Sequence, residues 1–190
     1  MPIGTLKNVF AFFCLGSVLY IFISLVSYSS LDPSLSSVSS LSGDIVNLGG
    51  PFGAYLSDAL YSVIGLGAYL FLTIISFAAV KTLFFYQQTD SLHNAIQITS
   101  AIFLISSFST LCEFYYSGDY FPQSSSGGLV GNLLFTNLSN IFGVVGSLIF
   151  IVIFFLASVS LTFSFSWLSV MDALGKSTKY FFQEFTSQFI

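Results

Sequence analysis

The stretch that decides the fold is residues 47–58, which read Asn-Leu-Gly-Gly-Pro-Phe-Gly-Ala-Tyr-Leu-Ser-Asp. Its glycines, its proline and its carboxylate stand directly before a long apolar segment, residues 59–80. Gly49 and Gly53 are four residues apart, a spacing that lets another backbone come close. Pro51 has no backbone N–H and suits the first turn of a helix. The stretch therefore predicts a tight turn that leads into a membrane helix.

The composition around this stretch places the chain in a membrane. Of its 190 residues, 55% are hydrophobic and only 6% are charged, whereas a soluble domain is normally about a quarter charged. Most of the exterior must therefore face lipid, and we expect an all-α polytopic protein whose main partner is the lipid bilayer. The net charge of −4 argues against direct nucleic-acid binding by this segment, because such binding needs a basic surface.

Four segments are long and apolar enough to cross about 30 Å of hydrocarbon as helices. We expect them at about residues 9–28, 59–80, 95–112 and 141–163. The uncharged run from residue 127 to residue 165 is too long for one crossing. Residues 127–140 are therefore predicted to form a half-helix or a re-entrant loop before the fourth span.

These spans make one membrane domain, residues 1–175, followed by a tail at residues 176–190. In the tail, Phe181, Phe185 and Phe189 are four residues apart and would share one face of a helix. We expect either a cytoplasmic helix on the membrane surface or the start of a linker.

The lysines predict the orientation. With four crossings, all four lysines lie on the side of the N-terminus, and the two loops on the other side carry acids only. By the positive-inside rule, both termini are expected in the cytoplasm and the glycine-rich re-entrant segments on the outer side.

An internal repeat accompanies this topology. A shift of 78 residues places one set of glycines and leucines on another, and both copies read Gly-Gly-x-x-Gly before a long apolar helix. The matched glycines are Gly49 with Gly127, Gly50 with Gly128, Gly53 with Gly131 and Gly65 with Gly143. Leu129 and Thr136 replace Pro51 and Asp58 in the second copy. We expect two hairpins in the same orientation, the parallel kind of repeat.

The residue types that enzymes use are sparse. The single histidine, His93, excludes a plausible Ser–His–acid triad, and Gly175-Lys176-Ser177-Thr178 lacks the earlier glycine of a phosphate-binding loop. We expect no catalytic, cofactor-binding or metal-binding residue in this segment. Asp58 is the ionisable residue nearest a span, and we interpret it as lying near a helix N-terminus, where the macrodipole favours a carboxylate.

Two groups of residues resemble a known family. Ser27-Tyr28-Ser29-Ser30-Leu31-Asp32-Pro33-Ser34 is similar to the Ser-Tyr-x-x-x-Asp-Pro-Ser signature of the FtsK/SpoIIIE DNA translocases, in their N-terminal four-helix membrane domain. The run from Asn47 to Asp58 resembles the Asn-x-Gly-Gly-Pro-x-Gly-Ala-x-x-x-Asp motif of the same domain. The resemblance covers roughly residues 5–175. The structural motif residues that it marks are Asp32, Pro33, Asn47, Gly49, Gly50, Pro51, Gly53, Asp58, Gly127, Gly128 and Gly131.

The resemblance implies a role and partners. It implies a multi-pass anchor in the bacterial inner membrane at the division septum, in contact with other cell-division membrane proteins and assembled as a homo-oligomer, a hexamer in the family. ATP and magnesium belong to the motor domain of a full-length relative, which these 190 residues do not contain. Two alternatives stay open: a small transporter or channel, which normally keeps an ionisable group in the membrane, and a stand-alone four-helix division protein without a motor.

Overall fold

A computed structural model describes residues 3–34, 45–84, 91–116, 125–164 and 166–187 of the chain. Within these ranges the regular structure is entirely helical. The six helices are α1 (Ile3–Val26), α2 (Gly50–Ile64), α3 (Gly67–Phe84), α4 (Ser91–Tyr115), α5 (Gly128–Phe163) and α6 (Trp167–Ser187).

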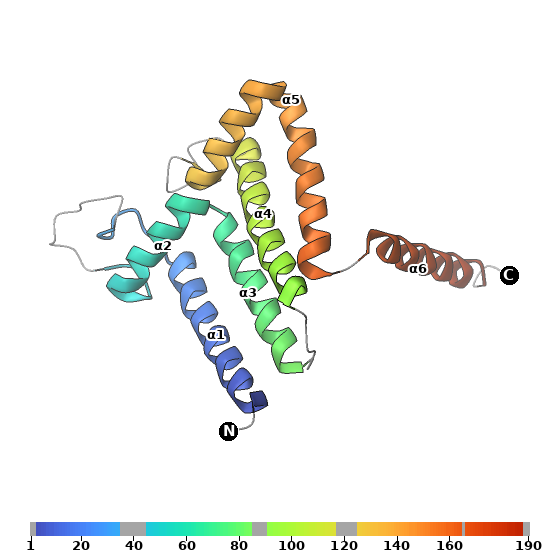
Figure 1. Ribbon diagram of the computed structural model, residues 1–190, viewed down its shortest axis with the longest axis horizontal. Helices are drawn as coiled ribbons and strands as arrows, with labels where there is room; N and C mark the ends of the chain where they lie inside the picture. Colours follow the sequence, from blue (N-terminus) through green and yellow to red (C-terminus); the bar gives the residue numbers. More distant parts are fainter. Residues whose placement is uncertain (1–2, 35–44, 85–90, 117–124, 165, 188–190) are drawn as a thin grey trace.

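Four of these helices are long and apolar enough to cross a membrane, which confirms the predicted four-helix polytopic fold. They cover Leu6–Val26, Gly67–Phe84, Ser91–Tyr115 and Gly128–Phe163. In Figure 1, α1 and α4 run in one direction, and α3 and the second part of α5 run in the other. Helix α1 packs against α3, and α4 packs along α5. The chain is thus two helical hairpins side by side.

The predicted second span, Ala59–Val80, is not one helix. It is divided at Gly65, where α2 ends with the backbone at φ 57° and α3 begins two residues later. A glycine with positive φ turns the chain without the steric cost that any other residue would meet. Helix α2 therefore lies across one end of the bundle, and α3 alone descends from it (Figure 1).

Helix α5 bends in the same way, at Gly143, whose φ of 69° and ψ of 170° are not helical. Residues 128–142 form a short helix across the end of the bundle, and residues 144–163 form the descending helix (Figure 1). The sequence had predicted a half-helix or loop at 127–140 before the fourth span; the structure shows the half-helix, which ends at the next glycine.

The parallel repeat is present in the backbone itself. Among the residues that the structure describes, four glycines have positive φ: Gly50 at 68°, Gly128 at 63°, Gly65 at 57° and Gly143 at 69°. They form two pairs, each with the 78-residue separation of the sequence repeat. Each hairpin thus consists of an ascending helix, a glycine turn, a short helix across the end, a glycine corner and a descending helix. We refer to residues 47–53 and 125–131 as the first and second glycine turns.

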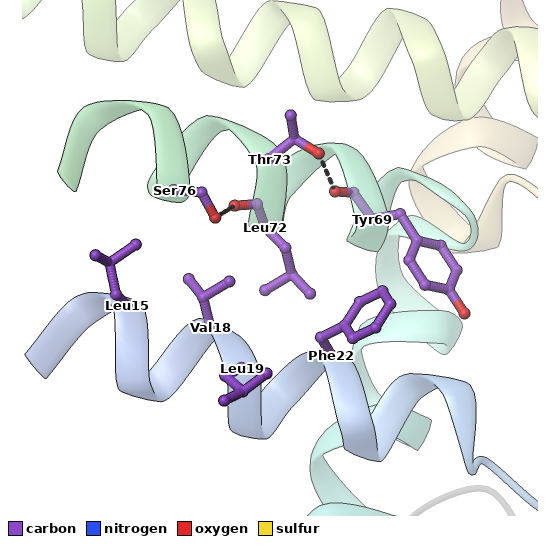
Figure 2. A pocket seen from close by; sticks show the side chains of 8 residues that line it. All are labelled: Leu15, Val18, Leu19, Phe22, Tyr69, Leu72, Thr73 and Ser76. Carbon is purple, nitrogen blue, oxygen red and sulfur yellow. Dashed lines mark hydrogen bonds between the residues drawn. The ribbon is translucent and has the colours of Figure 1, made fainter. Parts of the chain in front are cut away.

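The first hairpin has a small core and an open groove. Leu25, Tyr61, Ala68 and Leu72 are buried together where α1, α2 and α3 meet. Beside them a groove of about 410 Å³ lies between α1 and α3, and Figure 2 shows its side chains. The hydroxyls of Thr73 and Ser76 donate to the carbonyls of Tyr69 and Leu72 of their own helix, at 2.9 and 2.8 Å. The groove therefore presents a mainly hydrocarbon surface.

The tail is helical from Trp167 to Ser187, and α6 extends away from the four spanning helices (Figure 1). The predicted aromatic stripe falls outside the described part of the chain, since Phe189 and the side chains of Phe181 and Phe185 lie there. The surface location of the tail stays a prediction.

Candidate functional site

The first glycine turn is held by the carboxylate of Asp32. Asp32 follows α1 in sequence and is only 3% exposed. Its two oxygens accept the backbone N–H groups of Val46 and Asn47, both at 2.9 Å. A carboxylate that accepts backbone N–H groups makes charge-assisted hydrogen bonds, which are stronger than neutral ones. Asp32, with the half-buried Pro33 beside it, therefore fixes the segment that approaches α2.

Asn47 connects this segment to two helices. Its side-chain amide donates to the carbonyl of Ser24 in α1 at 2.9 Å and to the hydroxyl of Ser57 in α2 at 3.3 Å. Its side-chain oxygen accepts the N–H of Gly49 at 2.8 Å. Asn47 is 3% exposed, so its removal would take this partner from the buried Ser24 carbonyl and from the Gly49 N–H.

The glycines of this turn make room for α1. A Cβ atom at Gly53 would lie 2.7 Å from Asn47 Oδ1 and 2.7 Å from Ser24 Oγ, and one at Gly49 would collide with Ser24 Oγ. The close neighbours are therefore side chains and not the backbone that the glycine spacing had predicted. The hydroxyl of Tyr20 in α1 donates to the carbonyl of Gly49 at 2.7 Å and closes the contact. Pro51 is exposed at the start of α2, as its missing N–H allows.

Asp58 is fully buried and accepts a hydrogen bond from the hydroxyl of Tyr28 at 3.0 Å. The interpretation of Asp58 as a residue near a helix N-terminus is wrong, because α2 begins at Gly50 and its first turn contains no acid. The carboxylate lies in the middle of the helix and is stabilised by hydrogen bonding. The ring of Tyr28 also packs edge-on against Tyr61, with centroids 5.1 Å apart.

The two sequence signatures therefore contact each other. Ser27 accepts the N–H of Leu48 at 2.9 Å, Tyr28 donates to Asp58, and Asp32 accepts the N–H of Asn47. Each contact joins the segment that ends α1 to α2 or to the turn before it. The signature residues act together as a clasp that sets how α2 leaves α1.

The second glycine turn has a clasp of its own, built on Glu113. The Glu113 carboxylate accepts the N–H of Gly127 at 2.9 Å, the hydroxyl of Ser125 at 2.6 Å and the amide of Asn132 at 3.2 Å. Ser126 donates to the carbonyl of Cys112 at 2.9 Å. A carboxylate at the end of the ascending helix again holds the turn that follows, now without an Asp-Pro pair.

The glycines of the second turn pack against backbone. A Cβ at Gly131 would lie 2.6 Å from the carbonyl oxygen and 2.9 Å from the carbonyl carbon of Ser109 in α4. A Cβ at Gly127 would collide with the same carbonyl oxygen. A helix backbone cannot move aside as a side chain does, so a side chain at either position would force a shift of α4 or of the turn.

The two hairpins join where the corner of the first meets the turn of the second. Leu66, just after Gly65, donates its N–H to the carbonyl of Ser126 at 2.9 Å. A Cβ at Gly128 would lie 2.6 Å from the nitrogen of Gly65. Ser109 in α4 donates to the last carbonyl of α2, that of Ile64, at 2.8 Å. The second hairpin thus supplies the hydrogen bonds that the break in the first requires in a membrane.

The structure adds Ser24, Glu113, Ser109 and Ser126 to the predicted residues. The repeat gives no signal for Glu113, because the 78-residue shift places Asp32 on Thr110. The serines carry no signal either, since hydroxyl residues are common throughout these helices.

The arrangement supports hydrogen bonding and close packing. In the part of the chain that the structure describes, no three histidine, cysteine or acidic side chains are grouped so that they could hold a metal ion. Asp32 and Glu113 hold backbone N–H groups, and Asp58 holds a tyrosine hydroxyl.

Comparison with known proteins gives one family. Residues 4–175 match the model described as the 4TM region of DNA translocase FtsK/SpoIIIE. This range contains the four spanning helices, both glycine turns and both clasps.

Curated relatives agree with that match. The chain is 29% identical over 170 residues to DNA translocase FtsK 1 of Neisseria meningitidis serogroup A. This match covers 87% of this chain and 21% of the relative. It is 30% identical over 173 residues to DNA translocase FtsK of Pseudomonas aeruginosa, again 87% of this chain and 21% of the relative. The chain therefore spans about a fifth of the length of these relatives. No solved structure matches it.

Proposed function

The chain belongs to the family of the 4TM region of DNA translocase FtsK/SpoIIIE, and we propose on that premise that it is the membrane anchor of a septal DNA translocase in cell division and chromosome partition. The observation that carries the proposal is the family match over residues 4–175. All four apolar spanning helices fall within that match.

An anchor needs a fixed shape in the bilayer, and the clasps supply one. Asp32, Asn47 and Glu113 hold the two glycine turns through hydrogen bonds to backbone groups. We infer no catalysis in this segment, because the buried or half-buried acids Asp32, Asp58 and Glu113 are engaged in structural hydrogen bonds. The ATP and magnesium of translocation would belong to the motor of the full-length protein, and the other partners would be cell-division membrane proteins.

The proposed topology places both termini in the cytoplasm of a bacterium, with the glycine turns on the outer side of the inner membrane. Two observations support it. Lys7 lies near the start of α1 and Lys81 in the last turn of α3, at the end of the bundle where α3 and α4 are connected (Figure 1). Asp32 and Glu113 lie at the opposite end, beside the glycine turns. Positive side chains are retained on the cytoplasmic side of a membrane.

Localisation of a fluorescent fusion of the native, full-length protein in dividing cells tests the septal role. The proposal predicts a band at the division site, and deletion of residues 4–175 should disperse it. A fusion to an unrelated polytopic membrane protein is the control for even staining. Even staining of the native fusion would contradict the septal role.

Topology is tested separately with a membrane-impermeant thiol reagent on intact cells. Ser37→Cys and Gln123→Cys should both react from outside, whereas Lys81→Cys should react only after the cells are opened. Reaction of Lys81→Cys in intact cells would reverse the proposed orientation. Liposomes that contain the protein test the channel alternative. The anchor predicts no solute flux across them, whereas a flux that is lost on Asp58→Asn would favour a channel.

A further inference from the structure

The chain leaves the fourth spanning helix through a turn that α4 helps to hold. Ser164 ends α5 with φ 55° and ψ 41°, and its N–H donates to the carbonyl of Ser160. Among the described residues it is the only one besides glycines with positive φ. A left-handed residue at this position ends a helix and turns the chain off its axis. The side-chain amide of Gln97 in α4 donates to the Ser164 hydroxyl at 2.9 Å, so the bundle itself fixes the direction in which the chain leaves α5.

This turn brings the start of α6 back beside α5. The indole N–H of Trp167 donates to the carbonyl of Leu156 at 3.3 Å. Leu156 lies eight residues before Ser164, which is about 12 Å along a helix at a rise of about 1.5 Å per residue. Leu156 is 42% exposed on a helix that is long and apolar enough to cross the membrane, so its side chain faces lipid. Trp167 therefore lies level with the last turns of the span and not beyond its end.

Trp167 also shows how α6 is rotated about its own axis. Successive residues of an α-helix are about 100° apart around that axis. Apolar residues therefore follow Trp167 on its own face of α6: Val170, Met171 and Leu174. Polar residues occupy the opposite face: Ser169, Asp172 and Lys176. Because the Trp167 indole reaches back along α5 toward the middle of the span, the apolar face is the one that faces the bilayer.

In the described part of the chain, no other helix covers this apolar face. Met171 and Leu174 are 67% and 60% exposed, and none of the other described helices packs along α6. In Figure 1, α6 runs sideways from the end of α5 and not along it. It is also not among the described helices that are apolar enough to cross a membrane. A helix with one apolar and one polar face that does not span is typical of the membrane surface.

We propose that α6 lies flat in the surface of the leaflet at which α5 ends, with Trp167, Met171 and Leu174 among the upper acyl chains and Lys176 in water. The partner of the apolar face is lipid, because this face is continuous with the lipid-facing surface of α5 at the contact between Trp167 and Leu156. Tryptophan is enriched at this depth, where its ring meets hydrocarbon and its N–H finds a polar partner.

The charges of α6 indicate which property of the lipid matters. Residues 167–187 contain two lysines and two acids, so attraction to anionic headgroups nearly cancels. Burial of apolar side chains is then what holds the helix to the surface. The chain consequently leaves the membrane domain along the bilayer surface and not straight into water. This inference goes beyond anchoring by the four spans and does not depend on a septal location.

Fluorescence of the single tryptophan tests the first turn of α6 in the unmodified chain, because Trp167 is the only tryptophan. The full chain is placed in phosphatidylcholine vesicles that contain lipids brominated at either shallow or deep acyl positions. Shallow bromines should quench Trp167 more than deep ones, and iodide added on both sides should quench it weakly. Vesicles with added phosphatidylglycerol should give the same pattern. Strong quenching by iodide without quenching by bromine would overturn the proposal.

A matched pair of labels tests α6 farther along, where the end of α5 has no influence. Leu174→Cys and Lys176→Cys are each labelled with an environment-sensitive fluorophore, in a chain with Cys14→Ala and Cys112→Ala that keeps the Trp167 pattern. The two positions are both exposed and lie on opposite faces. The label at Leu174→Cys should emit at shorter wavelength and be quenched by shallow bromines, whereas the label at Lys176→Cys should be quenched by iodide. Equal quenching of both labels by iodide would show that α6 is in water.

The same label distinguishes lipid from a second copy of the chain. Quenching by bromine at Leu174→Cys should be unchanged when the protein is strongly diluted in lipid. If the label becomes accessible to iodide on dilution, a second copy covers the face and the proposal is wrong.

A charged variant removes the contact outside the packed bundle. Met171→Asp places a carboxylate on the apolar face, so the label at Leu174→Cys should lose quenching by bromine and gain quenching by iodide. Ser169→Asp is the matched control on the opposite face and should change neither. Equal effects of the two variants would contradict a face-specific contact. These measurements use purified protein, so their failure leaves the septal role standing, and an even distribution in dividing cells leaves this inference standing.

Discussion

The first and second glycine turns follow the same backbone path but are held by different chemistry. In the first, hydrogen bonds of Asp32 and Asn47 fix the turn, and the glycines face the side chains of α1 and of Asn47. In the second, Glu113 binds the turn directly, and the glycines face the backbone of α4. The positive φ angles recur at equivalent positions, whereas the clasps do not. The repeat therefore preserves where the chain turns, and each hairpin secures its turn in its own way.

The largest expected contrast is between Gly128→Ala and Gly50→Ala. Both add a Cβ at positive φ, which costs about 1–2 kcal/mol. Only Gly128 also faces backbone, at 2.6 Å from Gly65 nitrogen, and overpacking adds about 1–3 kcal/mol. In chemical unfolding of the purified chain in detergent, the free energy of unfolding should fall by about 2–5 kcal/mol in Gly128→Ala. In Gly50→Ala it should fall only by the cost of positive φ, about 1–2 kcal/mol. Equal losses would show that the junction between hairpins is not tight.

The next contrast is between the two clasp carboxylates. Asp32→Ala removes the acceptor of the buried Asn47 N–H and of the N–H of the exposed Val46. Loss of a partner costs a buried group about 1–3 kcal/mol and an exposed one less. We expect a loss of about 2–4 kcal/mol in the same unfolding measurement. Glu113→Ala should cost about half as much, because Glu113 is half-buried and water can replace part of its bonding.

Asp32→Asn is the control, since it keeps one oxygen acceptor and the size of the side chain. It should recover part of the stability that Asp32→Ala loses. If Glu113→Ala proves the more damaging of the two alanine variants, the ranking of the clasps by burial is wrong.

A smaller contrast separates Gly131→Ala from Gly53→Ala. The new Cβ at Gly131 meets the Ser109 backbone, whereas the one at Gly53 meets the side chains of Ser24 and Asn47, which can rotate. Gly131→Ala should lose about 1–3 kcal/mol through overpacking, and Gly53→Ala should lose less. The larger Gly53→Val should disturb folding or assembly. If Gly53→Val changes neither folding nor assembly, the first turn is not closely packed. The prediction of close packing at the second turn would be unaffected.

Sequence patterns predicted the repeat and the number of spans because both depend on periodic features. Hydrophobic length marks each crossing, and the glycine spacing marks each turn. The break of the second span at Gly65 was missed because it lies inside an uninterrupted apolar run. That break is stable only because Ser126 and Ser109, far along the chain, satisfy the backbone at the corner. Contacts of this kind leave no signal in a local window of sequence.

The partner of Asp58 is a second feature that local sequence could not reveal. Local reasoning associated the carboxylate with a helix N-terminus because an apolar run follows it. The helix in fact starts eight residues earlier, at the glycine and proline that the sequence had marked as a turn. The partner, Tyr28, is 30 residues away and belongs to the other signature. The resemblance to a family identified both residues, but only the fold shows that they act on each other.

The pair of Tyr28 and Asp58 has no equivalent in the second hairpin, and it gives the smallest expected effect. Thr136, the counterpart of Asp58, is exposed, whereas Asp58 is fully buried. Tyr28→Phe removes the hydroxyl that donates to Asp58 at 3.0 Å but keeps the ring packed on Tyr61. We expect a loss of about 1–2 kcal/mol, the usual cost of one missing partner of a buried group.

Asp58→Asn distinguishes the hydrogen bond from the charge, because the amide oxygen can still accept from Tyr28. It should cost less than Tyr28→Phe. Asp58→Ala removes the acceptor altogether, and its combination with Tyr28→Phe should cost less than the two losses added together, since the residues are coupled. Additive losses in this cycle would mean that the contact contributes nothing to the clasp. The first turn would then depend on Asp32 and Asn47 alone, and the two turns would be more alike than the structure indicates.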